Sequence, residues 1–297
     1  MATIIKHSVN GKEYNYLSYS YRENDRVLKK EKYLGREIPP YDDLVQIWEI
    51  FSYEIFEEKW MPLIEKITKK YRKIINVMPL EIRIKNLRNF GIRFTHHSTK
   101  IEGSPLSLRD VEAVIANGIL PKNKPINDAI ETKAHMALYE KIIATTEELS
   151  IDFLCKWHKE LFQITQHNSA GVIRDYPVEI SGSNYEPPMS KIEIDMMLDD
   201  LFKWYNEKKN KLHPVFVASV VHYRFVAIHP FGDGNGRMAR LLTTYILNKD
   251  KYPLFDIDPK IRYQYYKALE KADQKDYPFP FIQWFSKAYI KDNKRYL

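Results

Sequence analysis

Apolar residues recur three and four positions apart along most of the chain, which is the spacing of helices that bury one face. Beyond Pro40 this period is clearest in the segments 42–60, 80–103, 191–208 and 213–228. Glycine and proline residues separate the periodic segments, as they commonly do at the ends of helices. We therefore expect a mainly α fold, built as a helical bundle.

Two regions depart from the helical period. In residues 1–40, an Asn10–Gly11 turn signal is followed by alternating tyrosine and leucine, which predicts a small N-terminal β appendage. Residues 171–190 hold short β-like pieces around Gly182 and a pair of prolines, so we expect a β-hairpin inserted into the bundle. These patterns together predict four parts, namely residues 1–40, 41–85, 86–104 and 105–297.

The composition indicates a folded protein, with 44% hydrophobic and 29% charged residues. No apolar run reaches the about 18 residues of a membrane span, and Met1–Asn10 lacks the apolar core of a signal peptide. We therefore expect no membrane partner and a cytoplasmic location. Because Cys155 is the single cysteine, it cannot form an internal disulfide, and we expect it to be a buried, unreactive thiol.

The net charge of +7 is unevenly distributed. Residues 59–100 contain eleven lysines or arginines but only two acids, Glu65 and Glu81. This stretch has the charge to bind nucleic acid or an acidic protein. The basic residues are interleaved with core-type isoleucine, leucine and phenylalanine, which favours the alternative that they form the solvated face of ordinary helices.

The segment from His229 to Arg240 reads HPFGDGNGRMAR and stands directly before a strongly apolar helix. Gly232, Gly234 and Gly236 permit backbone conformations closed to other residues and let the main chain approach a ligand closely. The first amide groups of the following helix have no partners within the helix and attract phosphate oxygens. This loop therefore predicts an anion-binding site.

The side chains of the loop suit the handling of a polyphosphate. Arg237 and Arg240 are three residues apart, so both are expected on one side of the helix, where they can grip two phosphates. Asp233 can hold a magnesium ion, and His229 can take a proton from an attacking hydroxyl. An ordinary turn between two helices is the alternative for a loop of this kind. A zinc site is not expected, because Pro230 and the glycines oppose the helix that would pair His229 with Asp233.

The segment resembles the Fic family motif at every position, from histidine, proline and phenylalanine to the final arginine. Residues on both sides of it also look like the family, namely His222, Phe225, Ile228, Tyr265, Tyr266, Ala268 and Leu269. The resemblance spans roughly Phe90 to Ile290. It implies a Fic-type helical bundle and a protein adenylyltransferase, which moves AMP from ATP to a tyrosine, threonine or serine hydroxyl of a target protein.

The resemblance also implies a role for each residue of the motif. His229 would deprotonate the target hydroxyl, and Asp233 would hold Mg²⁺. The residues expected to bind the phosphates of ATP are Gly234, Asn235, Gly236, Arg237 and Arg240. The 21 tyrosines of the chain make self-modification an expected side reaction.

Residues 170–188 resemble the family's flap, a hairpin that aligns the target's backbone by strand addition. The residues expected at its tip, where the target docks, are Ile180, Ser181, Gly182 and Tyr185. An ordinary surface hairpin is the alternative.

A second segment, which contains Ser98, Glu102 and Gly103, resembles an inhibitory motif of the same family. Ser98 and Glu102 are four residues apart and share a helix face, and Gly103 is a natural helix terminator. The resemblance implies that Glu102 pairs with Arg240 and keeps ATP in an unreactive pose. Residues 86–104 would then be the inhibitory helix region and residues 105–297 the catalytic domain. Taken alone, the pair is compatible with an ordinary helix surface.

The sequence leaves several alternative functions open. Family members on this scaffold can transfer phosphate or phosphocholine, and in some the glutamate supports removal of AMP. A nucleic-acid-binding regulator with a vestigial nucleotide pocket would use the basic residues 59–100. The sequence also leaves open whether the chain forms a homo-oligomer.

Overall fold

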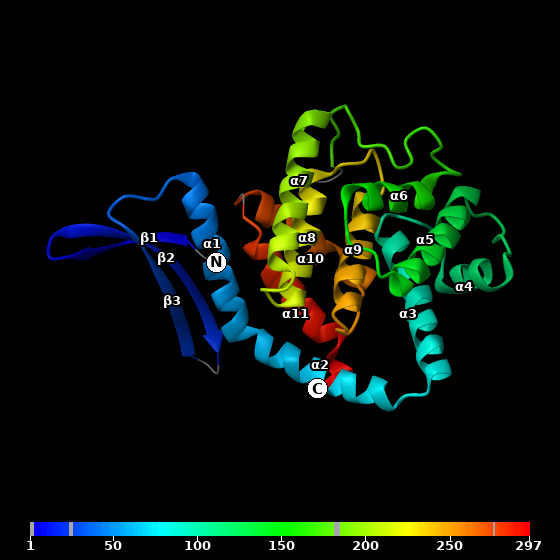
Figure 1. Cartoon of the computed structure of the whole chain (residues 1–297), viewed down its shortest axis with the longest axis horizontal. Helices are drawn as coiled ribbons and strands as arrows, with labels where there is room; N and C mark the ends of the chain where they lie inside the picture. The colour runs from blue at the N-terminus through cyan, green and yellow to red at the C-terminus, as the bar shows by residue number, and fades with distance from the viewer. Residues whose placement is uncertain (1–2, 24–25, 181–184, 276) are drawn as a thin grey trace. The chain divides into compact units, whose positions relative to one another are not determined.

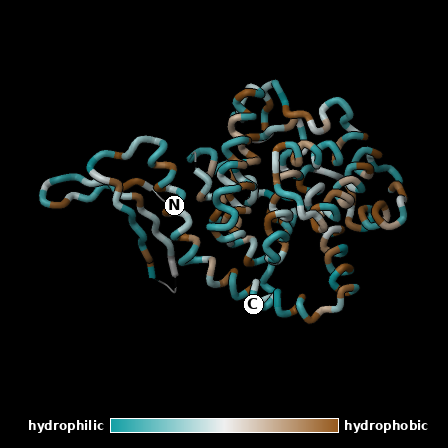
Figure 2. Tube along the Cα trace, in the orientation of Figure 1, coloured by the Kyte–Doolittle hydropathy of each residue, from teal (hydrophilic) through white to brown (hydrophobic). Residues whose placement is uncertain are grey.

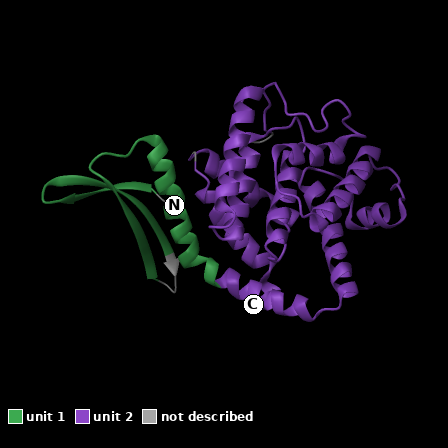
Figure 3. Cartoon of the chain, in the orientation of Figure 1, with its two compact units in different colours: residues 1–62 green, residues 63–297 purple. Residues whose placement is uncertain are grey.

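The structure is a computed structural model of the chain, and it describes residues 3–23, 26–180, 185–275 and 277–297 (Figure 1). The chain forms two compact units, Met1–Pro62 and Leu63–Leu297 (Figure 3). The division therefore falls within the helical region expected at residues 41–85. The expected boundary at residues 85 and 86 lies inside one continuous helix, α3 (Leu80–Ile101).

The first unit is a three-stranded antiparallel sheet followed by a helix. Its elements are β1 (Thr3–Val9), β2 (Lys12–Glu23), β3 (Arg26–Gly35) and α1 (Tyr41–Lys59), and the strand order is β1-β2-β3. Asn10 and Gly11 both have positive φ, 53° and 75°, as a two-residue turn between β1 and β2 requires. Leu17 and Tyr19 alternate along one face of β2 and are buried. The prediction of an N-terminal β appendage is therefore confirmed.

The second unit is helical throughout its described elements. After α2 (Met61–Val77) and α3 it contains α4 (Leu108–Asn117), α5 (Ile126–Ala144), α6 (Ile151–Phe162), α7 (Lys191–Lys208), α8 (Pro214–Ile228), α9 (Asn235–Lys249), α10 (Arg262–Asp273) and α11 (Phe279–Asp292). Two short 3₁₀ turns complete it, Pro259–Ile261 and Lys294–Tyr296. Hydrophobic and hydrophilic positions are interspersed along the helices, as helices with one buried face require (Figure 2). The mainly α prediction is confirmed.

Helices α8 and α9 form the centre of this unit. Helix α8 packs against α7, α9 and α11, while α9 packs against α3, α5 and α8. Because neighbours cover α8 on several sides, its residues from Val215 to Tyr223 are all buried. The loop that joins these two helices is therefore supported on a rigid base.

The segment between α6 and α7 differs from the expected hairpin. Its described residues form no strand, and Ser181 and Gly182 of the expected tip lie outside the described residues. Pro177, Pro187 and Pro188 remove amide donors that a strand ladder would need. The described parts are instead irregular connections fixed by side chains.

Some basic residues of the stretch 59–100 form contacts within the second unit. Arg88 and Arg93 form ion pairs with Glu140 and Asp256. Arg72 donates to the carbonyls of Asp250 and Lys251, and Lys70 donates to the carbonyl of Leu297. Four of the eleven basic residues of the stretch 59–100 thus form contacts within this unit, and nucleic-acid binding by the stretch stays a prediction.

Two smaller expectations concern the membrane and the cysteine. Among the helices that the structure describes, none is long and apolar enough to cross a membrane. The Cys155 side chain is half-buried, and burial raises the pKa of its thiol. A raised pKa lowers the thiolate fraction at neutral pH, which agrees with an unreactive thiol.

Candidate active site

The glycine-rich loop joins α8 to α9 through two left-handed residues. His229, which ends α8, has φ 49° and ψ 55°, and Gly234, which precedes α9, has φ 78°. The Asn235 side chain closes the loop, since its Nδ2 donates to the Phe231 carbonyl at 2.8 Å and its Oδ1 accepts from the Phe231 amide at 3.0 Å. Among the described residues, no side chain caps the amides that begin α9. The loop is thus rigid and presents a helix N-terminus, as an anion site requires.

These contacts revise the expectation for Asn235. Both polar groups of its side chain are occupied by the main chain of Phe231, and the residue is buried. Its side chain therefore shapes the loop, and phosphate binding through its main-chain amide stays a prediction.

Two glycines of the loop are required by close neighbours. A Cβ atom at Gly234 would collide with the Phe162 ring, and one at Gly236 would collide with the Glu102 carboxylate. Gly236 thus lets a carboxylate from another helix lie directly over the first turn of α9. Any larger residue at this position would exclude Glu102 from the place that it occupies.

His229 has the features of a general base. Its Nδ1 lies 3.3 Å from the Val226 carbonyl, which can only accept, so Nδ1 carries the proton and Nε2 keeps its lone pair. Burial lowers the pKa of His229, and the positive charge of Arg174 lowers it further, while Glu102 and Asp233 oppose this shift. The imidazole is therefore neutral at pH 7 and able to accept a proton.

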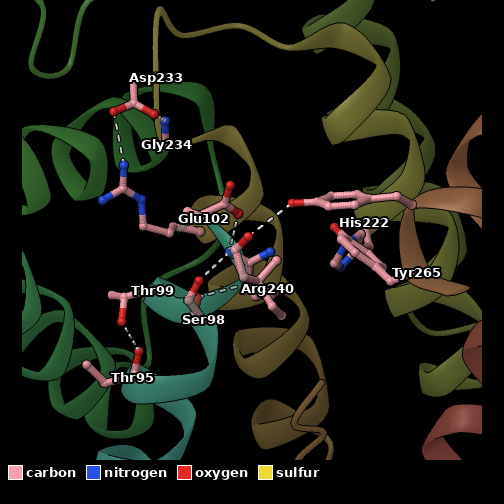
Figure 4. Close-up of polar contacts among 12 residues, drawn as sticks. Thr95, Ser98, Thr99, Glu102, His222, Asp233, Gly234, Arg240 and Tyr265 are labelled. Atoms are coloured by element: carbon pink, nitrogen blue, oxygen red, sulfur yellow. Dashed lines mark hydrogen bonds and ion pairs between the residues drawn. The ribbon is translucent and has the colours of Figure 1, made fainter. Parts of the chain in front are cut away.

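Arg240 lies at the centre of a contact between α9 and the end of α3 (Figure 4). It is buried, and its Nε donates to Ser98 Oγ at 2.9 Å while its Nη2 donates to the Ser98 carbonyl at 3.0 Å. Nη2 also meets the Glu102 carboxylate at 2.5 Å. Glu102 follows the last residue of α3, and Gly103, with φ 102°, turns the chain away. The structure thus brings together Ser98, Glu102 and Arg240, the contact that the family resemblance implies.

Arg237 has different partners from those of Arg240. It forms ion pairs with Glu131 of α5 and, at 3.0 Å, with Asp233, and its guanidinium lies 4.4 Å from the centre of the Phe162 ring. The two arginines are therefore each held by a carboxylate from another helix. Glu131 was missed by the sequence reasoning, because nothing in the local pattern of α5 distinguishes it from other polar positions.

The Asp233 carboxylate is half-exposed and hydrogen-bonded. Oδ2 accepts from Arg237 and, at 2.8 Å, from Gln166, and Oδ1 accepts from the Gly234 amide at 2.5 Å. Although burial opposes ionisation, the Arg237 charge and these hydrogen bonds outweigh it and lower the pKa of Asp233. A metal held here needs further oxygen ligands from a phosphate, since the described residues contain no group of three or more potential ligands.

His158 is a second residue that the sequence reasoning missed. Its Nδ1 accepts from the Gly171 amide at 2.8 Å, so Nε2 carries the proton and donates to the Asp233 carbonyl at 3.1 Å. The ring stacks on Phe231, with centroids 3.8 Å apart. Burial lowers the pKa of His158 to about 4, which keeps the ring neutral. A neutral histidine thus ties α6 to the loop.

Replacing His158 with leucine is expected to destabilise the second unit by about 2 kcal/mol. The Gly171 amide and the Asp233 carbonyl would both lose a partner, at about 1 kcal/mol each. For a unit of this size the melting temperature should fall by roughly 4–8 °C, which thermal unfolding followed by circular dichroism can measure. His167→Leu changes an exposed histidine and should leave the melting temperature unchanged. An unchanged His158→Leu protein would show that these bonds contribute nothing.

A protein-family model and several known proteins match parts of this chain. Residues 148–247 match the model of the Fic/DOC family. Protein adenylyltransferase fic-1 of Caenorhabditis elegans is 29% identical over 217 residues, which cover 71% of this chain and 42% of that protein. Protein adenylyltransferase Fic of Nematostella vectensis is 27% identical over 241 residues, covering 79% and 56%. This chain thus spans about half the length of these curated relatives.

Solved structures share the fold. A Fic-domain-containing signalling protein from Bacteroides thetaiotaomicron superposes with a TM-score of 0.70 at 24% identity, over 79% of this chain and 95% of the other. Fic-1 from C. elegans gives a TM-score of 0.70 at 24% identity, over 87% and 77%. The described helices are therefore arranged as in the Fic fold.

Proposed function

Because this chain carries a Fic domain at its centre, we propose that it transfers AMP from ATP to a hydroxyl group of a protein. One observation carries this proposal. A histidine with a free Nε2 lies in the same loop as an uncapped helix N-terminus and two buried arginines. This combination supplies a base for the hydroxyl and positive groups for a triphosphate.

The reaction follows from the positions of these groups. His229 Nε2 takes the proton of the target hydroxyl as its oxygen attacks the α-phosphorus of ATP. The bond from that phosphorus to the bridging oxygen breaks, and pyrophosphate leaves. Arg237, Arg240 and the first amides of α9 stabilise the charge that develops on the phosphate oxygens. The chain contributes positioning and charge, and forms no covalent intermediate of its own.

We propose that Asp233 holds a magnesium ion together with phosphate oxygens of ATP. Its ionised carboxylate is a hard oxygen ligand, and Mg²⁺ is commonly bound through one or two carboxylates plus substrate phosphates. The ion would neutralise phosphate charge during the transfer. Arg237 and Gln166, which bind Asp233 here, hold the carboxylate at the mouth of the loop.

Asp233→Asn is expected to reduce the transfer rate by about a hundredfold and to raise the magnesium concentration at half-maximal rate, because the amide is a weaker metal ligand. A magnesium titration at fixed ATP separates this effect from weaker ATP binding. The control is Asp200→Asn, which changes an exposed aspartate of α7. If Asp233→Asn kept the wild-type magnesium dependence, Asp233 would not be the ligand.

We propose that Glu102 inhibits the transfer by occupying Arg240. Arg240 is buried and its guanidinium is bound by Ser98 and Glu102, so a phosphate can reach it on that side only if the carboxylate moves. The main target-docking surface would be the segment around residues 180–185. Of these residues the structure describes Ile180 and Tyr185, and both are partly exposed. Tyrosine, threonine and serine, including those of this chain, are the proposed acceptors.

ATP labelled on either the α- or the γ-phosphorus tests the proposed reaction. The protein is incubated with magnesium and each label, alone and with a protein extract, and label on protein is counted. AMP transfer predicts label from the α-phosphorus only, with release of pyrophosphate. Label from the γ-phosphorus would show phosphate transfer instead. Loss of label from previously modified protein after ATP is removed would show that the same site also removes AMP.

A further inference from the structure

Arg174 lies against the catalytic loop from the segment between α6 and α7. Its Nε donates to the His229 carbonyl at 2.7 Å, and its main-chain amide donates to the Pro230 carbonyl at 3.0 Å. Nη1 donates to the Tyr176 carbonyl at 2.6 Å. The side chain is 2% exposed. One arginine thus binds two consecutive carbonyls of the loop that begins with the proposed base.

The charge of Arg174 is not paired. None of the carboxylates that the structure describes lies within ion-pair distance of it, although Glu193 is near enough to favour its charged form, and its Nη2 has no hydrogen-bond partner among the described residues. Burying an unpaired charge is costly, and an apolar side chain of similar length would fill the space at lower cost. Burial lowers the pKa of Arg174, but an arginine stays protonated at neutral pH. An unpaired buried charge of this kind points to a use for the charge itself.

Arg174 binds the carbonyl of a residue in the left-handed conformation. With φ 49°, His229 occupies the left-handed region, which few residues other than glycine adopt and which costs of order 1 kcal/mol or more. The hydrogen bond from Arg174 to its carbonyl holds this turn, and the turn sets the direction of the imidazole. The charged groups that face the imidazole are Arg174, Glu102 and Asp233, and Arg174 alone among them is positive.

We propose that Arg174 is a positioning residue for His229, which holds the left-handed turn and keeps the imidazole in its neutral, proton-accepting form. This proposal rests on the proposed role of His229 as the base. The hydrogen bonds of the guanidinium hold the turn. Its positive charge disfavours the charged form of the imidazole. Removing the charge should therefore raise the pKa of His229, whereas changing the shape alone should not.

Two variants separate the effects of charge and shape. Arg174→Gln keeps a donor but removes the charge, and Arg174→Lys keeps the charge but loses the fork. The rate of AMP transfer at saturating ATP is measured from pH 5 to pH 9. We expect both variants to lose about tenfold or more in rate at pH 7.5. We expect the acid limb of the profile to move up by about one pH unit in Arg174→Gln only.

The matched control is Arg72→Met. Arg72 also donates to two consecutive carbonyls, those of Asp250 and Lys251, but it is remote from the loop in the described contacts. This variant is expected to lower the melting temperature without moving the pH profile. A displaced profile in Arg72→Met, or equal displacement in the two Arg174 variants, would overturn the proposal.

The titration of the His229 imidazole by NMR gives a readout that does not depend on activity. Its signal is assigned as the one missing from His229→Ala. We expect a higher pKa for His229 in folded Arg174→Gln than in the wild type and in Arg174→Lys. An unchanged pKa would overturn the role of Arg174 even if AMP transfer is observed. A raised pKa without any transfer would retain that role and reject only the proposed reaction.

Discussion

Replacing Glu102 with glycine is expected to raise the rate of AMP transfer by about ten- to a hundredfold. In this structure the Arg240 guanidinium is bound by the Glu102 carboxylate at 2.5 Å and is buried on every side. A phosphate of ATP must break that bond before it can use Arg240. A hydrogen bond between charged groups is worth about 1.5–3 kcal/mol, and every 1.4 kcal/mol changes a rate by about tenfold.

The measurement is the initial rate of α-label incorporation at saturating ATP and magnesium. Glu147→Gly serves as the control, because Glu147 lies exposed in the loop before α6. The melting temperature gives a second readout. Without ATP, Glu102→Gly should melt below the wild type because buried Arg240 loses its carboxylate. Added ATP should stabilise the variant more than the wild type. Equal rates in Glu102→Gly and wild type would reject inhibition by this residue.

Replacing His229 with alanine is expected to reduce AMP transfer by about a hundredfold to ten-thousandfold, the usual contribution of a general base. The loss should be measured in the Glu102→Gly background, where the rate is highest. ATP binding should persist, because the phosphates are bound by the arginines and the start of α9. The increase in melting temperature caused by ATP should therefore be similar in the two proteins.

The pH dependence gives an independent check on His229. Its pKa lies below the ordinary value of about 6.5, because burial and Arg174 disfavour the imidazolium. The acid limb of the rate profile, where His229 becomes protonated, should therefore lie at lower pH than the pKa of an ordinary imidazole would place it. His167→Ala, an exposed histidine, should keep the rate and this profile. Transfer that continues in the His229→Ala variant would show that another group takes the proton.

The local features of the site could be predicted from the sequence because they depend on neighbouring residues. Gly234 adopts the left-handed conformation that a glycine permits, and an uncapped helix follows it. Asn10 and Gly11 form the predicted turn for the same reason. The pairing of Arg240 with Glu102 was reached through family resemblance, since local spacing shows only that Ser98 and Glu102 share a helix face.

The contacts between distant segments could not be predicted in this way. Glu131 is 106 residues from Arg237, and Arg174 is 55 residues from His229. Neither residue stands in a pattern that differs from an ordinary helix surface or loop. The hairpin expected at residues 171–190 was likewise not predicted correctly from local pattern, because the described residues of this segment form no strand.

The sequence by itself therefore determined the helical periods, the β appendage and the glycine turn that precedes the helix start at residue 235. Each depends on side-chain spacing and backbone preferences over a few residues. Only the tertiary structure decided that Glu131 holds Arg237 and that Arg174 binds the His229 carbonyl. These roles depend on how α5, α9 and the segment between α6 and α7 pack around the loop, and packing places side chains together irrespective of their separation along the chain.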